Sequence, residues 1–131
     1  MYNINIITTV TLLILDFLWI GLFMGKQYQK QILDIQGSKM KTKPIFALMS
    51  YILMVIGMNL FVIPNIHKGK ELEGSLIYGL TFGIVMYGVY DFTAGAVFDK
   101  WNTKLALIDI AWGGFVYFIS SYLGSKWGLA P

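Results

Sequence analysis

The sequence has no cysteine and no arginine, and His67 is its only histidine. Without cysteine the chain cannot form disulfide bonds, zinc–thiolate sites, iron–sulfur clusters or a cysteine nucleophile. One histidine is too few for paired haem ligation or for a histidine-box di-iron site. The seven methionines are interpreted as packing residues, because copper sites generally combine methionine with histidine or cysteine. We therefore expect no metal and no cofactor.

Charge is also scarce. Only 13% of the 131 residues are charged and 56% are hydrophobic, whereas about 25% of residues are charged in soluble domains. The formal net charge of +3 comes from ten lysines that lie between apolar runs, so the sequence does not indicate a nucleic-acid partner. We expect residues 1–131 to form a single integral membrane domain whose partner is the lipid bilayer.

Four apolar runs are long enough to cross a hydrocarbon core, which takes about 20 helical residues. In a bilayer every backbone N–H and C=O needs a partner within the protein, so runs of this length should be helices. The sequence therefore predicts an all-α, four-helix transmembrane bundle, multi-pass in a membrane that it does not identify. The predicted spans are about residues 4–25, 44–63, 76–98 and 105–124.

The lysines predict the orientation of the bundle. Three of them fall on the face that carries both termini, and seven fall on the face of the first and third loops. Because lysine is enriched on the cytoplasmic side, we predict that both termini are non-cytoplasmic. The first span lacks a basic leader and a cleavage site, so we expect it to stay in the mature protein.

The first loop, from Lys26 to Lys43, has two interpretations. Its apolar residues recur near a helical turn, which is compatible with an amphipathic helix on the inner membrane surface. Alternatively, the first span continues about two turns past the bilayer until Gly37 ends it. We favour the continuous helix, because the segment is short for an interfacial anchor.

The most informative residues are three carboxylates inside the predicted spans, Asp16, Asp91 and Asp109. A charge at the bilayer centre costs about 2.5 to 3.5 kcal/mol, and no lysine or histidine lies within a span to neutralise them. We expect all three to lie in the inner half of the membrane and to point at one another, at other polar partners or at water. At least one of them should bind a proton readily, because low dielectric and mutual repulsion disfavour the charged form.

Aromatic residues accompany these carboxylates at helical spacing. The first and fourth spans both carry Asp-x-x-Trp-x-Gly, which places each aspartate and tryptophan on one helical face. Tyr87 and Tyr90 precede Asp91 by four residues and one residue. Reciprocal Trp-to-Asp contacts between the two spans fit this spacing. The candidate ligand- or proton-binding residues are Asp16, Trp19, Tyr87, Tyr90, Asp91, Asp109 and Trp112.

Glycines permit close helix approach in the third span. Gly79-x-x-x-Gly83 matches a common membrane dimer pattern. We favour packing within the bundle, with a homodimer as the alternative.

The stretch Tyr-Gly-x-Tyr-Asp-x-Thr at 87–93, followed by Asp-x-x-Trp-Gly at 109–113, resembles a family of small predicted membrane proteins, the domain-of-unknown-function family 2177. The resemblance extends over nearly the whole chain. It implies a fold and a membrane location but no activity. Where this family carries asparagine after Asp-x-Thr, this chain has Ala94.

Our first hypothesis for function is an inner-leaflet acidic and aromatic pocket that binds or transports protons or a small cation, including an organic cation held by cation–π contacts. A lipid-modifying enzyme, or an accessory to one, with paired aspartates as acid and base is the alternative, and we rank an enzyme lower. A third interpretation is a structural protein without a ligand, in which polar contacts only join helices.

Overall fold

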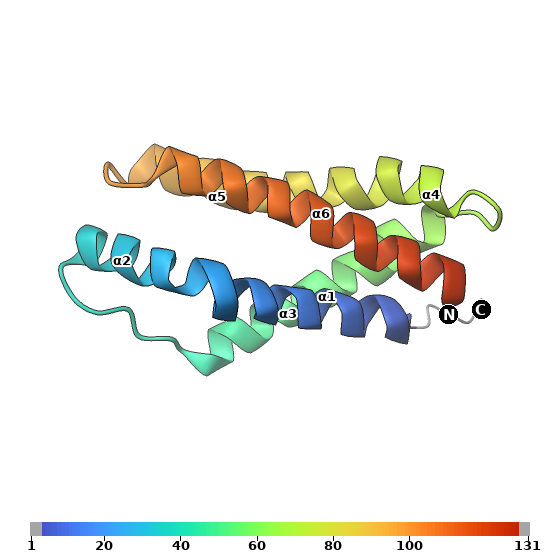
Figure 1. The fold of residues 1–131 in the computed structure, drawn as a ribbon, viewed down its shortest axis with the longest axis horizontal. Helices are drawn as coiled ribbons and strands as arrows, with labels where there is room; N and C mark the ends of the chain where they lie inside the picture. The colour runs from blue at the N-terminus through green and yellow to red at the C-terminus, as the bar shows by residue number, and fades with distance from the viewer. Residues whose placement is uncertain (1–3, 129–131) are drawn as a thin grey trace.

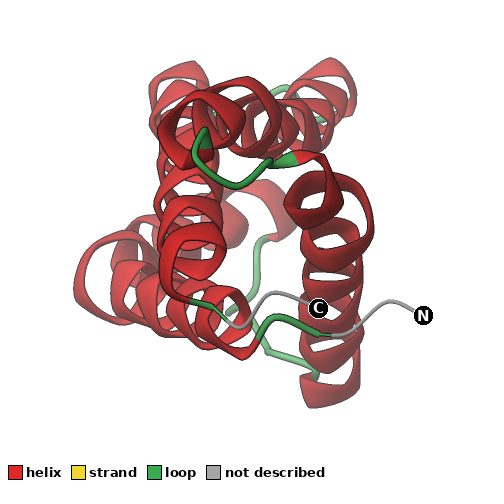
Figure 2. Cartoon of the chain, turned by 90° about the vertical axis from the view of Figure 1, so that its right-hand side faces the viewer, coloured by secondary structure: helices red, strands yellow, loops and turns green. Residues whose placement is uncertain are grey.

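The computed structural model describes residues 4–128. Four long helices dominate it, at Ile6–Gln36, Pro44–Asn65, Glu71–Val97 and Thr103–Trp127, and each is long and apolar enough to cross a membrane. They run side by side along one long axis (Figure 1). Within the described residues the only regular structure is helical (Figure 2). The prediction of an all-α, four-helix transmembrane bundle is confirmed.

Three of the four helices contain a π-helical turn. The first helix consists of α1 (Ile6–Trp19), the π turn η1 (Ile20–Met24) and α2 (Gly25–Gln36). The second consists of α3 (Pro44–Gly57), η2 (Met58–Val62) and the 3-10 turn η3 (Ile63–Asn65). The third consists of α4 (Glu71–Gly74), η4 (Ser75–Leu80) and α5 (Thr81–Val97), and the fourth is α6 (Thr103–Trp127).

The first helix is continuous well past its predicted end at residue 25. This confirms the favoured interpretation of the first loop and excludes a separate amphipathic helix there. Gly37 ends α2 with a left-handed φ of 74°, a conformation that glycine adopts at no steric cost. Pro44 lies in the first turn of α3, and the Asn102 side chain caps α6 by accepting from the Leu105 backbone N–H.

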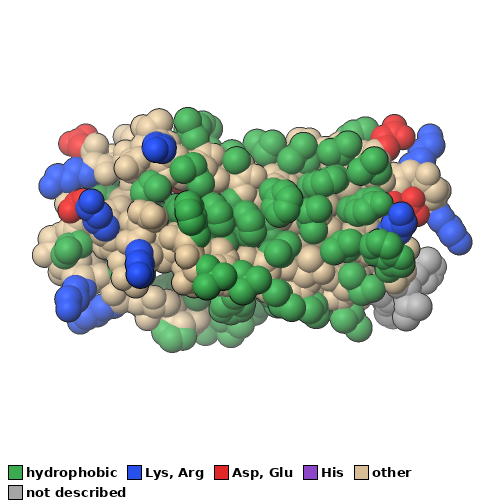
Figure 3. Space-filling view, viewed as in Figure 1, with side chains coloured by type: hydrophobic (Ala, Val, Ile, Leu, Met, Phe, Trp, Pro, Cys, Tyr) green, Lys and Arg blue, Asp and Glu red, His purple; other side chains and the backbone are tan. Residues whose placement is uncertain are grey.

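On the face seen in Figure 3, apolar side chains form a belt across the middle of the molecule, and charged side chains gather at its two ends. Leu22, Phe46 and Val89 are each more than 60% exposed, so large apolar side chains face outward. A soluble protein buries most of its large apolar side chains, whereas a protein in a bilayer exposes them to lipid. We call the end with loops 37–43 and 98–102 the lysine-rich end, and the end with both termini the terminal end (Figure 1).

The fourth helix is the centre of packing, with its main contacts to α5, η4 and α1. Glycine makes the contact with the third helix possible. A Cβ added at Gly83 would collide with the Gly113 carbonyl oxygen, and one added at Gly79 would collide with the Ser121 hydroxyl. Both members of the Gly79-x-x-x-Gly83 motif are therefore used for packing inside the bundle.

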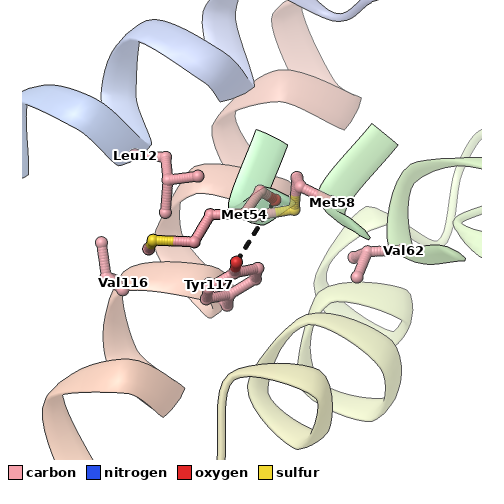
Figure 4. Close-up of a cluster of buried hydrophobic side chains, with 6 residues drawn as sticks. All are labelled: Leu12, Met54, Met58, Val62, Val116 and Tyr117. Carbon is pink, nitrogen blue, oxygen red and sulfur yellow. Dashed lines mark hydrogen bonds between the residues drawn. The ribbon is translucent and has the colours of Figure 1, made fainter. Parts of the chain in front are cut away.

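A small apolar cluster fills the middle of the bundle (Figure 4). The hydroxyl of Tyr117 donates to the backbone carbonyl of Met54 at 3.3 Å, which joins the second and fourth helices across this cluster. The cluster's residues are Leu12, Met54, Met58, Val62, Val116 and Tyr117.

Polar packing joins the helices at the terminal end. The Asn5 side chain caps α1 and also donates to the Gly124 carbonyl at 2.9 Å, while the Asn5 backbone N–H donates to Asn59 at 2.6 Å. Thr8 and Ser120 are fully buried near this end. The two interhelical bonds of Asn5 are of the kind expected where lipid offers no alternative partner, whereas the Thr8 and Ser120 hydroxyls have no hydrogen-bond partner among residues 4–128.

The close approach at Gly83 predicts a specific effect on stability. We expect Gly83→Ala to lower the free energy of unfolding in detergent by about 1–3 kcal/mol, because the new methyl group overpacks a backbone contact. Gly21→Ala is the matched control, since no atom lies within 4 Å of its added Cβ. Equal thermal stability of the two variants would contradict the packing.

The orientation in the membrane stays a prediction, and the absence of native cysteine allows a clean measurement of it. We expect a membrane-impermeant maleimide to label Lys68→Cys, at the terminal end, in intact cells. Lys39→Cys, at the lysine-rich end, should react only in inverted vesicles or after permeabilisation. The reverse pattern would place the termini in the cytoplasm.

Candidate functional site

The three carboxylates of the predicted spans are all buried, with exposed fractions of 6% for Asp16, 2% for Asp91 and 6% for Asp109. They come from α1, α5 and α6, and both α1 and α5 pack against α6. They do not converge on a single point, because no three acidic or histidine side chains among residues 4–128 are grouped as a metal site would require. The carboxylates form two neighbouring groups instead.

The first group is centred on Asp16. Tyr51, from α3, donates its hydroxyl proton to Asp16 Oδ2 at 2.7 Å, and Tyr87, from α5, donates to Oδ1 at 3.2 Å. The Asp16 carboxylate therefore has a donor on each oxygen and joins three helices. Neutral phenol donors stabilise a carboxylate without supplying a counter-charge.

The second group contains Asp91 and Asp109. Tyr28, from α2, donates to Asp109 Oδ1 at 2.6 Å. The Asp91 and Asp109 side chains lie close enough to hydrogen-bond to each other when one holds a proton. Asp91 Oδ2 is buried and has no hydrogen-bond partner among the described residues. A pair of adjacent acids without a nearby cation is the more unusual of the two groups.

Two tryptophan rings accompany the two groups. Trp19 of α1 and Trp112 of α6 stack with their ring centroids 4.4 Å apart and their planes 4° apart. These are the tryptophans of the two Asp-x-x-Trp motifs, so the repeated spacing corresponds to one contact between the first and fourth helices. Phe23 and Phe115 cover the stack on either side, at centroid distances of 4.9 Å and 5.6 Å.

The expected reciprocal Trp-to-Asp contacts form only in part. Trp112 lies near Asp16, but the indole N–H groups of Trp19 and Trp112 are buried and donate to no partner within residues 4–128. The two indoles stack on each other instead.

Of the remaining candidates, Tyr87 lies within the Asp16 group, whereas Tyr90 does not contribute a hydrogen bond to either group. Tyr90 is 61% exposed, and its ring packs edge-on against Trp101 at 6.0 Å. One residue of offset from Asp91 turns Tyr90 by about 100° around the helix, toward the outer surface.

The sequence analysis did not place Tyr28 in the site, and η1 explains why. In an unbroken α-helix, Tyr28 would point about 120° away from Asp16, twelve residues earlier. A π turn takes up one extra residue, which reduces that angle to about 20°. The burial pattern agrees with this change of phase. Phe23, seven residues after Asp16, would share its face in a regular helix but is 50% exposed, whereas Met24, eight residues after Asp16, is fully buried. No local sequence signal marks this turn.

Further contacts fasten α2 over the start of α6. Gln31, a buried residue of α2, accepts from the Asn102 backbone N–H at 2.6 Å, and Lys100 Nζ donates to the Asp34 carbonyl at 3.1 Å. Together with the Tyr28–Asp109 bond, these contacts hold α2 against the α5–α6 connection. The paired carboxylates are therefore covered on the side of the lysine-rich end.

A protein-family model matches most of the chain. The family described as "Predicted membrane protein (DUF2177)" matches residues 1–126. The chain belongs to this family. Its description agrees with a multi-pass membrane location, which the four apolar helices independently support. Comparisons with curated proteins and with solved structures give no match.

The π turn that aligns Tyr28 with the acid cluster predicts an unusual mutational pattern. We expect Met24→Ala to lower the free energy of unfolding by about 2–5 kcal/mol, because it removes a fully buried side chain. Phe23→Ala should have a much smaller effect, although a regular helix would place Phe23 inward. Denaturation in detergent measures both variants, and a larger effect at Phe23 would disprove the π turn.

Proposed function

We propose that this membrane protein binds protons, or exchanges a small cation for protons, at the Asp91–Asp109 pair and at Asp16. The adjacency of Asp91 and Asp109 carries the proposal. Two carboxylates of adjacent helices lie together in a low-dielectric interior, where both cannot be charged without a cation. A shared proton is the smallest occupant that relieves their repulsion.

The hydrogen-bond donors around the cluster support this proposal. Tyrosine hydroxyls donate hydrogen bonds to the side-chain oxygens of both Asp16 and Asp109. Such donors solvate a charged carboxylate, yet they leave the net charge of the site to be set by protons or by a bound cation. Ionisable residues inside membranes are functional sites by default, because their insertion is costly.

The aromatic residues favour a proton or a small inorganic cation over an organic one. An organic cation would need free aromatic faces for cation–π contacts. The Trp19 and Trp112 faces are stacked against each other, and Phe23 and Phe115 pack beside them. The tryptophans therefore act as a rigid link between the first and fourth helices.

Proton binding can be measured directly by infrared difference spectroscopy of the purified protein between acidic and alkaline pH. We expect the wild type to show a protonated-carboxyl band, and Asp91→Asn and Asp109→Asn each to reduce it, because either change removes one member of the pair. Reconstituted vesicles with an internal pH dye should lose proton flux in the same variants. Asp16→Asn tests the first group in the same way.

Exposed carboxylates provide matched controls, since Asp34→Asn and Asp99→Asn make the same chemical change outside the cluster. These variants should leave both the protonated-carboxyl band and the proton flux as they are in the wild type. A band that persists unaltered in Asp16→Asn, Asp91→Asn and Asp109→Asn would refute proton binding at the cluster. In that case, lower thermal stability alone would leave only a structural role for the three residues.

A further inference from the structure

A second feature lies at the lysine-rich end, outside the acid cluster. An open cavity on the surface, with a volume of about 520 Å3, is lined by Lys39, Lys41 and Lys43, together with Ile32, Gln36, Ser38 and Met40. No acidic residue lines it. The cavity therefore combines three cationic groups with apolar side chains, and it shares no residue with the carboxylate groups described above.

The chain builds this cavity by reversing direction between the first two long helices. Gly37 ends α2, and the Gln36 side-chain amide donates to the backbone carbonyls of Ser38 and Lys39, at 3.1 Å and 3.2 Å. These bonds hold the start of the loop against the end of α2. The loop then leads to Lys43, which precedes Pro44 at the first turn of α3.

The cavity lies next to the apolar belt. Ile45 and Phe46, directly after it in the chain, are 61% and 67% exposed, as lipid-facing residues are. Lys43 Nζ lies over the Phe46 ring, 5.6 Å from its centroid, so the lysine marks the boundary between charge and hydrocarbon. In a bilayer leaflet, the phosphate layer lies at the boundary between charge and hydrocarbon.

We infer that this cavity holds the headgroup of an anionic phospholipid from the adjacent leaflet. Its three lysines match a phosphodiester, and basic residues beside a transmembrane helix attract anionic lipids. The positive end of the α3 dipole adds to that attraction. Ile32 and Met40 provide apolar contacts for the glycerol and the first acyl carbons. The inference is independent of the proposed function.

General lysine enrichment at this end does not account for the arrangement. An orientation bias requires only that lysines lie on the correct side of the membrane. Lys26, Lys30, Lys100 and Lys104 meet that requirement without lining the cavity. The orientation bias does not explain why Lys39, Lys41 and Lys43 line one cavity. An anionic ligand in that cavity does.

The test compares lipid binding by the full chain in detergent, using native mass spectrometry with phosphatidylglycerol and phosphatidylcholine as probes. We expect one phosphatidylglycerol to bind in preference to phosphatidylcholine. The triple variant K39Q/K41Q/K43Q should weaken this binding at least tenfold, since each lysine near an anionic headgroup contributes measurably. The variant K26Q/K30Q/K104Q removes the same charge at the same end outside the cavity, and should bind like the wild type.

Three results would overturn the inference. Equal loss in both triple variants would show a diffuse charge effect instead of a site. Equal binding of phosphatidylglycerol and phosphatidylcholine would remove the requirement for a negative headgroup. Displacement of the lipid by soluble glycerol phosphate at similar concentration would make the cavity an anion site without lipid specificity. Circular dichroism of each variant verifies that the helices remain folded.

Discussion

The fold is constrained by three carboxylates placed in a low-dielectric interior without a basic residue to neutralise them. Each carboxylate must find its partners on other helices, because lipid offers none. Tyr51 and Tyr87 connect Asp16 to α3 and α5, and Tyr28 connects Asp109 to α2. The cost of the buried acids is thus offset by contacts that fix the relative positions of all four long helices.

Much of the fold could be predicted, because a membrane reduces folding to a few strong rules. Spans follow from apolar length, and their ends follow from local chemistry such as Pro44 and Asn102. The pairing of the first and fourth helices also follows from the repeated Asp-x-x-Trp spacing, which the Trp19–Trp112 stack reflects. In each case a short-range pattern carried the information.

The partners of the carboxylates could not be predicted in the same way. Tyr28 reaches Asp109 only because a π turn changes the phase of the helix between them, and hydropathy does not distinguish that turn from regular helix. The tryptophan N–H groups were equally plausible donors for Asp16 by spacing alone. The choice of tyrosine depends on the reach of side chains from three other helices, which is a property of the assembled bundle.

The second helix is the least firmly packed of the four, since α3 makes few contacts with α1 and its remaining contacts lie mainly in η2 and η3. Near the lysine-rich end its hydrogen bond to the rest of the bundle runs from Tyr51 to Asp16. Binding of a proton or cation at Asp16 would change how strongly its carboxylate accepts the Tyr51 hydrogen bond. It would therefore change how firmly the second helix is attached to the bundle.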